Sequence, residues 1–282
     1  MKTTRFMLCA DDYALSPGVS RGILEALSAG RLTATSAMTN RPSWPVAARA
    51  LAAFADKADL GLHLNLTAGG PLGAMPAFAP DGYFPKLTAV IGASLLGRLP
   101  EAEIRAEIDR QIDAFTAAMG RPPDFVDGHQ HVQILPGVRR WLIEALTKRA
   151  LAGRVWLRDS ADGVSAILAR RVEAAKALQV AALATGFARA ARAAGFETNE
   201  GFAGFSSFDP SRSYRGDFAR FLIAPGARPL IMCHPGHADA ELAAVDEVLA
   251  SRELELAYLL SPEFTTDLAA RSAVPGRWGN PD

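Results

Sequence analysis

Cysteine is scarce in this sequence, which has only Cys9 and Cys233 among its 282 residues. Both lie in apolar runs, so we expect buried thiols without a chemical role, and a framework of several disulfides is excluded. Long apolar runs are also missing. None approaches the roughly 20 residues of a membrane helix, and the N-terminal apolar stretch is too short for a signal peptide. We therefore expect a cytoplasmic protein without a membrane span.

An excess of charge of either sign is absent as well. Lys plus Arg and Asp plus Glu both number 30, so the formal net charge is zero. No overall basic field favours a nucleic acid as partner, and no acidic tail suggests a scaffold. No glycine-rich phosphate-binding pattern follows any strand-like run, so nucleotide binding is not supported.

What the sequence does have is a regular alternation of strand-like and helical runs, with 49% hydrophobic residues to form a large core. The expected strands cover residues 6–10, 33–39, 60–67, 125–126, 154–157, 196–205, 229–233 and 254–260. The expected helices cover residues 17–29, 45–55, 100–119, 136–150, 209–223 (after an initial loop), 241–250 and 262–270, with one or two more in 162–194 and a break near 185–186. Residues 69–85 should form a loop, and the tail from residue 272 should lie along the surface.

This alternation predicts a parallel sheet with crossover helices. Seven or eight such units without a linker favour a single α/β domain over residues 1–282 that forms a closed or nearly closed barrel. A doubly wound open sheet is the alternative.

Two adjacent carboxylates, Asp11 and Asp12, follow the first strand-like run, and Ser16-Pro17 then marks a helix start. Like charges this close oppose each other's ionisation, so a cation or a need for a base would help to retain both. The alternative is that they only begin a loop and cap a helix.

Histidines stand at the ends of other strand-like runs. His63 lies in the third run, His129 and His131 follow the fourth, and His234 and His237 follow the run 229–233. In a barrel all of these strand ends face one mouth. One carboxylate and two imidazoles would form a three-ligand catalytic metal site, for zinc or less often another divalent ion, and the free Asp could accept the proton of water. The pattern therefore indicates metal-assisted hydrolysis.

Structural roles remain open for these residues. His63 could be a hydrogen-bonded core histidine, and the turn His234-Pro235-Gly236 could be only a turn. His129 and His131 are not both expected to be ligands, because one can bind the metal while the other lines the pocket or packs. Asp127 could be a solvated acid or could orient an imidazole from behind.

Four segments, CADDYALS, GLHLNLT, DGHQHVQILP and MCHPG, occur in this order and resemble the YdjC-like (ChbG/HpnK) carbohydrate deacetylases over about residues 5–260. The resemblance implies a distorted, TIM-like (β/α) barrel of about seven parallel strands. It also implies hydrolysis of the N-acetyl group of a sugar with one divalent metal ion, Mg²⁺ or Zn²⁺. The usual Asp-Asp-Phe-Gly has Ala14 in place of Gly here, and Gln133 stands where members often carry His.

Position by position, the resemblance implies a role for each site residue. The metal ligands would be Asp12, His63 and His129, the general base Asp11 and the general acid His234, with His131 contacting the substrate in the pocket. Another metal-dependent hydrolase on the same barrel, or a non-catalytic sugar-binding protein, are the alternative functions. The identity of the sugar and of the metal stays open, as does a homodimer.

Overall fold

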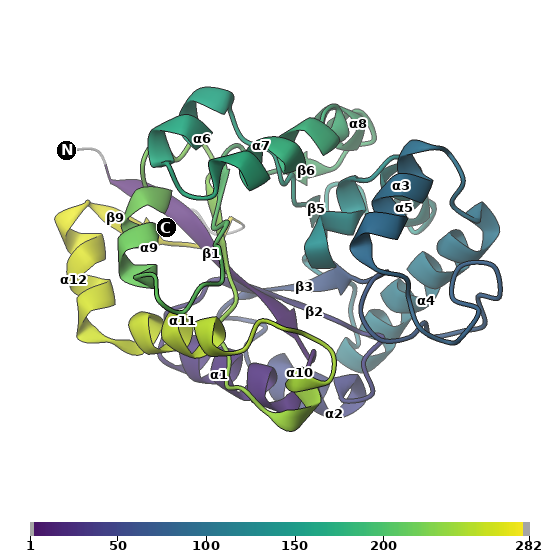
Figure 1. Cartoon of the computed structure of the whole chain (residues 1–282), viewed down its shortest axis with the longest axis horizontal. Coiled ribbons are helices and arrows are strands. Elements are labelled where there is room, and N and C mark those ends of the chain that lie inside the picture. Colours follow the sequence, from purple (N-terminus) through teal and green to yellow (C-terminus); the bar gives the residue numbers. More distant parts are fainter. Residues whose placement is uncertain (1–2, 279–282) are drawn as a thin grey trace.

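The computed structural model describes residues 3–278, and a sheet of nine strands with parallel pairing lies at its centre (Figure 1). The main path has the order β6-β5-β4-β3-β2-β1-β8-β7, and β9 pairs with the start of β1. The strands are β1 (Thr4–Tyr13), β2 (Ala34–Ala37), β3 (Asp59–Leu64), β4 (Phe125–Gly128), β5 (Trp156–Leu157), β6 (Glu197–Thr198), β7 (Phe202–Ala203), β8 (Leu230–Cys233) and β9 (Ala273–Pro275).

The sheet curls into a distorted barrel because its two end strands belong to one chain segment. β6 pairs with β5, β7 pairs with β8, and only residues 199–201 separate β6 from β7. A linker of this length spans at most about 14 Å, so the two edges must lie close together. The predicted strand 196–205 is therefore a split strand that links both edges of the barrel. The predicted α/β barrel of about seven strands is confirmed.

Alternation along the strands sorts the side chains into two cores. On β1, Met7 and Cys9 belong to an inner cluster with Phe125, Trp156 and Met232, whereas Phe6, Leu8 and Ala10 pack in the larger cluster with the helices. Both cysteines are buried and free, as predicted. The inner cluster fills the barrel below its mouth.

Helices surround the sheet, and their boundaries follow local signals. Ser16 Oγ accepts a hydrogen bond from Val19 N at 3.2 Å and starts the first helix, while the longest helix ends at Gly120, whose φ is 68°. The helices are α1 (Pro17–Ser28), α2 (Trp44–Ala52), α3 (Leu87–Leu95), α4 (Glu101–Met119), α5 (Val138–Lys148), α6 (Val164–Arg170), α7 (Ala174–Leu183), α8 (Phe187–Ala193), α9 (Tyr214–Phe221), α10 (Ala240–Ala243), α11 (Ala250–Leu260) and α12 (Pro262–Ala270), with a 3₁₀ turn η1 (His129–Ile134).

Two predictions near the C-terminus are wrong. Residues 254–260 belong to helix α11, not to a strand. Their alternating Leu and Glu residues mimic a strand, but Arg252, Glu255, Leu256 and Leu259 are buried at helical spacing. The helix predicted for 241–250 shrinks to the four-residue α10, which Asp239 caps, and α11 begins only at Ala250.

Other boundaries differ less. The break near 185–186 is present between α7 and α8, but 162–194 holds three helices, and α3 was not predicted. The tail does more than lie along the surface, because Ala273–Pro275 pairs with β1; its residues 279–282 lie outside the described part. Within residues 3–278, no helix has both the length and the apolar character needed to span a bilayer.

Gly61 on β3 offers a test of this inner packing. A Cβ atom there would lie 2.5 Å from Cζ of Phe125, so we expect Gly61→Ala to lower the free energy of unfolding by about 1–3 kcal/mol through overpacking. The matched control is Gly92→Ala in α3, where a Cβ meets nothing within 4 Å and should stabilise the helix by about 0.5–1 kcal/mol. Urea denaturation measures both, and equal effects of the two substitutions would contradict the proposed packing.

Candidate active site

A layer of polar side chains covers the inner core at the C-terminal ends of the strands. Each polar residue stands two positions after an inner-core residue or Gly61, and Arg158 and His234 directly follow their strands. Period-two alternation therefore points these side chains to the same interior. These pairs are Cys9 and Asp11, Gly61 and His63, Phe125 and Asp127, Trp156 and Arg158, and Met232 and His234. The side chains inside the barrel therefore change from apolar to polar at one level, near the C-terminal ends of the strands.

Asp12 reaches the same interior because β1 bulges. Between the pairs Ala10–Thr35 and Tyr13–Ala37, β1 contains one residue more than β2, and Asp12 has a φ of 70°. Both neighbouring carboxylates therefore face the mouth instead of opposite sides. Ala14 also has a φ of 70°, in the left-handed region that glycine adopts most easily, which explains why the related motif usually carries Gly there.

Asp12 lies between two imidazoles. Its Oδ1 is 2.8 Å from His129 Nδ1 and 3.2 Å from His63 Nε2. One potential metal-ligand atom from each of these three residues lies within 4.8 Å of the other two, in a buried position. One carboxylate and two imidazoles suit a divalent transition-metal ion and leave coordination positions free.

The electrostatics of the cluster fit a cation. Burial alone would raise the pKa of Asp12, but His129 and Arg252 outweigh it and hold that pKa well below its usual range. Burial alone would lower the pKa of His63, but Asp127 and the other acids raise it to about 10. A bound divalent ion would place positive charge where the surrounding carboxylates otherwise stabilise a proton on His63.

Asp127 holds His63 from behind. Its Oδ1 is 2.7 Å from His63 Nδ1, and its Oδ2 accepts a hydrogen bond from the Ser36 hydroxyl at 2.9 Å. With Nδ1 occupied, the lone pair of Nε2 can face an ion, which is the arrangement that orients ligating histidines in metalloenzymes. Sequence reasoning did not identify Ser36.

Arg158 neutralises the acids beneath this cluster. It donates to both oxygens of Asp11, at 2.6 and 2.9 Å, and its Nη1 is 3.0 Å from Asp127 Oδ2. Burial raises the pKa of Asp11, and Arg158 offsets this only in part. Arg158 was not predicted as a site residue, although its place just after the strand-like run 154–157 was an available signal.

Helix α11 contributes two further buried charges. Arg252 Nη2 donates to Asp12 Oδ2 and to Asp246 Oδ2, both at 2.7 Å. One turn later, Glu255 accepts a hydrogen bond from the backbone N–H of His234 at 2.6 Å. The incorrect strand prediction for 254–260 concealed both, because only a helix places residues 252 and 255 on one face.

The remaining histidines occupy three different settings. His234 Nε2 is 4.0 Å from Asp11 Oδ2, and burial lowers the pKa of His234 well below its usual value. His131 contacts Ser160 Oγ through Nδ1 at 3.1 Å, and burial also holds its pKa well below the usual value. His237 Nε2 lies 3.0 Å from Glu25 Oε2 of α1 and takes no part in the contacts with Asp11, Asp12 or Asp127.

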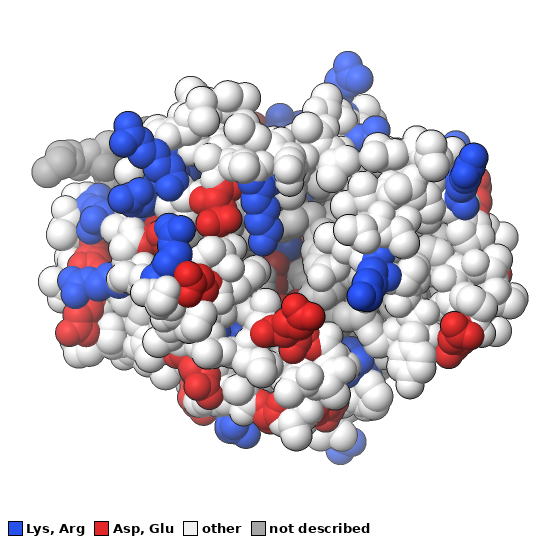
Figure 2. Space-filling view, in the orientation of Figure 1, with Lys and Arg blue, Asp and Glu red and all other residues white. Residues whose placement is uncertain are grey.

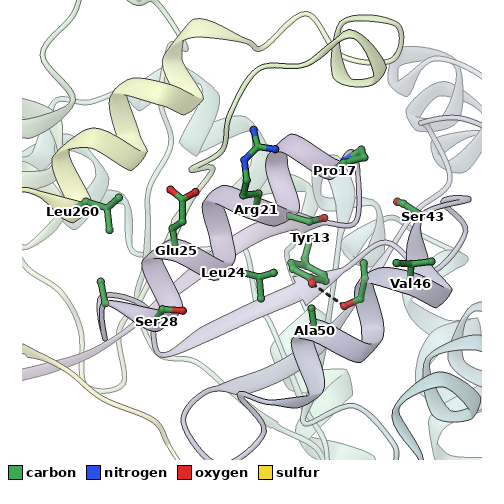
Figure 3. A pocket seen from close by; sticks show the side chains of 13 residues that line it. Tyr13, Pro17, Arg21, Leu24, Glu25, Ser28, Ser43, Val46, Ala50 and Leu260 are labelled. Carbon is green, nitrogen blue, oxygen red and sulfur yellow. Dashed lines mark hydrogen bonds between the residues drawn. The ribbon is translucent and has the colours of Figure 1, made fainter.

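The site opens into a cavity of about 350 Å³ whose lining includes Asp11, Asp12, His63, His129, His131 and His234. Figure 2 shows a hollow near the centre of the face turned toward the viewer. A larger groove of about 760 Å³ lies elsewhere, over α1 and α2, where Tyr13 donates a hydrogen bond to Ala47 O (Figure 3). That groove shares no lining residue with the site, so its size does not make it the reaction centre.

A parallel α/β barrel with a carboxylate–dihistidine cluster at its strand ends defines the class of this protein. The family model of YdjC-like proteins matches residues 5–270, and the chain belongs to that family.

Curated relatives carry deacetylase names. The chain is 32% identical over 269 residues to a chitooligosaccharide deacetylase of Serratia marcescens, with 95% of each chain covered. A carbohydrate deacetylase of Geobacillus stearothermophilus is 29% identical, with 93% of this chain and 91% of that protein covered. The match to the mouse carbohydrate deacetylase is 32% identical and covers 61% of this chain and 60% of the mouse protein, so the chain spans well under two thirds of that relative.

A solved structure supports the fold. A putative cellobiose-phosphate cleavage protein of Enterococcus faecalis superposes with a TM-score of 0.71 at 21% identity, and the alignment covers 99% of this chain and 98% of that one.

Glu255 gives this site a pH-dependent stability. Burial raises its pKa to about 7, so between pH 4.5 and 7 the folded chain binds more protons than the unfolded chain, and stability falls as pH rises. Glu255→Gln keeps an acceptor for His234 N–H and does not titrate. We expect its stability relative to wild type to improve by up to about 3 kcal/mol between pH 5 and pH 8.

Urea denaturation at the two pH values measures this difference. The control is Glu253→Gln on the exposed side of α11, for which the difference should be much smaller. If the free energy of unfolding of Glu255→Gln relative to wild type is the same at both pH values, the pKa of Glu255 is not raised in the folded protein.

Proposed function

We propose that this protein is a metal-dependent hydrolase that removes the acetyl group from an N-acetylated sugar and releases acetate and an amino sugar. The observation that carries the proposal is the cluster of Asp12, His63 and His129 with a second carboxylate, Asp11, in one cavity. Family membership and the names of the relatives support the same reaction.

One divalent ion, Mg²⁺ or Zn²⁺, would be held by Asp12, His63 and His129. Two nitrogen donors favour zinc, because magnesium prefers oxygen ligands and octahedral geometry. When bound, the ion supplies Lewis-acid polarisation of the amide carbonyl and lowers the pKa of water. Asp127 and Arg252 would keep the ligands oriented through their contacts with His63 and Asp12.

Asp11 is the proposed general base. Both of its oxygens accept from Arg158, which fixes the carboxylate in one orientation facing the cavity. Because its pKa is raised, Asp11 accepts a proton from the attacking water more readily than an exposed aspartate does.

His234 is the proposed general acid. Its lowered pKa makes it neutral before the reaction, so it must gain a proton before it can donate one. Its Nε2 lies 4.0 Å from Asp11 Oδ2, so the proton taken from water can pass to His234 after a small shift. His234 then protonates the departing amine nitrogen, and His131 contacts the sugar on the cavity wall.

The single domain, the cytoplasmic location and the homodimer stay predictions.

Acetate release from N-acetylglucosamine oligomers tests these roles. We expect His63→Ala and Asp11→Asn to lower kcat/KM by at least about 100-fold, because each removes a group that acts on the reacting atoms. His237→Ala is the matched histidine control and should keep wild-type kcat/KM. Wild-type-like acetate release by either site variant would disprove its role, and release of phosphate from phosphoesters without acetate would favour another hydrolase.

Zinc titration by calorimetry tests the metal separately from turnover. We expect one ion per chain in the wild type and an affinity about 10–100-fold lower in Asp127→Asn, because His63 loses its fixed orientation. The control His237→Ala should titrate like wild type. Saturable zinc binding without deacetylation of any N-acetyl sugar would favour the non-catalytic alternative.

A further inference from the structure

Two histidines of the cavity pack against phenylalanines that come from one short segment. The segment has the sequence FAGFSSF, with a phenylalanine at every third position. Its first two rings, Phe202 and Phe205, are buried, and their centroids lie 5.8 and 5.4 Å from that of His131. The third ring, Phe208, lines the cavity and meets His234 edge to face, with centroids 5.2 Å apart and an angle of 85° between the planes. The segment therefore contacts both cavity histidines that are not proposed as metal ligands.

Within the described residues, no hydrogen bond fixes the orientation of the His234 imidazole. Its Nδ1 is buried and has no hydrogen-bond partner there, and its Nε2 is 4.0 Å from Asp11 Oδ2, which is too far for a hydrogen bond. The candidate metal ligands differ, because Nδ1 of His63 and of His129 lies 2.7 and 2.8 Å from a carboxylate oxygen. Glu255 holds the backbone N–H of His234 but not its ring. Packing must therefore orient the ring.

Phe208 has a backbone conformation that few residues of its size adopt. Its φ of 57° lies in the left-handed region, where a bulky side chain is an outlier and costs free energy. Two local hydrogen bonds hold the turn. Phe208 N donates to Ser206 Oγ at 3.1 Å, and the next backbone N–H, of Asp209, donates to Ser207 Oγ at 3.3 Å. Such conformations persist where the surrounding structure requires them, and the contact with His234 is such a requirement.

Helix α7 holds the same aromatic ring through Lys176. The Nζ atom of Lys176 lies 4.8 Å from the centroid of Phe208, a distance at which an ammonium group and an aromatic ring attract each other. Both side chains line the cavity. The ring of Phe208 is thus restricted by its own turn, by α7 and by the histidine at the end of β8.

We propose that Phe208 is a positioning residue that holds the imidazole of His234 in the orientation for proton transfer to the departing amine. The proposal rests on the proposed deacetylation, in which His234 is the general acid. Proton transfer requires a ring nitrogen within hydrogen-bonding reach of the amine, and a rotated imidazole would not meet this requirement. The aromatic contact does for His234 what the carboxylate of Asp127 does for His63.

Two substrates with different leaving groups isolate this step. N,N′-Diacetylchitobiose is an amide, and its C–N bond breaks only when the nitrogen gains a proton. 4-Nitrophenyl acetate is an ester whose phenolate leaves without a proton, because its charge is delocalised into the nitro group. A general acid is therefore needed for the amide and not for the ester. Asp11→Asn should lose both activities, which shows that one site performs them.

Phe208→Ala should impair only the amide reaction. We expect its kcat on diacetylchitobiose to fall at least about tenfold with KM within about twofold of wild type, because the contact acts in the transition state. Its kcat/KM on the ester should stay within about twofold of wild type, which also shows that the variant is folded. Phe208→Tyr keeps the ring and should retain at least about half of the wild-type kcat on the amide.

A double-mutant cycle shows whether Phe208 acts through His234. In a His234→Gln background, Phe208→Ala should lower kcat on the amide by less than about twofold, because the ring that it positions is already gone. The matched control is Phe54→Ala. Phe54 also lies beside a lysine, with Lys57 Nζ 5.8 Å from its centroid, but it precedes the N-terminal end of β3, away from the C-terminal strand ends. This variant should keep the wild-type kcat on both substrates.

The outcomes separate the positioning role from the reaction. If Phe208→Ala keeps the wild-type kcat on diacetylchitobiose, or loses amide and ester hydrolysis equally, the positioning role is overturned and the deacetylase remains. Losses of equal size in the wild-type and His234→Gln backgrounds would also overturn it. No acetate from diacetylchitobiose or longer oligomers by the zinc-loaded wild-type protein would remove the proposed function, and the inference with it.

Discussion

Three buried carboxylates at one end of the barrel, Asp11, Asp12 and Asp127, are the constraint on which the rest of this structure depends. Each is at most 2% exposed, and like charges so close in a medium of low polarity repel strongly. Two buried arginines oppose this repulsion: Arg158 binds Asp11 and Asp127, and Arg252 binds Asp12. Removal of either arginine would leave uncompensated buried charge, which is far more costly than the loss of a surface ion pair.

The same network assigns different chemistry to two adjacent aspartates. Asp12 has one oxygen on Arg252 and the other between two imidazoles, so its pKa is low and it suits an ion. Asp11 is held at both oxygens by Arg158 but has its pKa raised by burial, so it suits a proton. The bulge in β1 makes this division possible, because an unbroken strand would point neighbouring side chains to opposite faces. Environment, not residue type, separates the two proposed roles.

The sequence pattern predicted the structure correctly where the signal was local or periodic. Alternating runs predicted the barrel, and Asp12, His63 and His129, found at ends of strand-like runs, lie together as predicted. It failed where packing overrides pattern. Leu254–Leu260 alternates like a strand, yet burial of Arg252, Glu255, Leu256 and Leu259 stabilises a helix. Arg158 follows a strand-like run, but its acidic partners are identified only when the sheet places Asp11 and Asp127 beside it. Arg252 was concealed by the wrong strand prediction for 254–260.

The sequence alone determined the order of most strands and helices, the place of acids and histidines at strand ends, and membership of a motif-defined family, because these properties depend on neighbours along the chain. Tertiary structure decided the pairing of charges and the register at which polar residues replace the inner core. These depend on contacts between residues far apart in the sequence, such as Asp11 with Arg158 and Asp12 with Arg252. Burial, which sets each pKa and each apolar contact, exists only after the barrel forms.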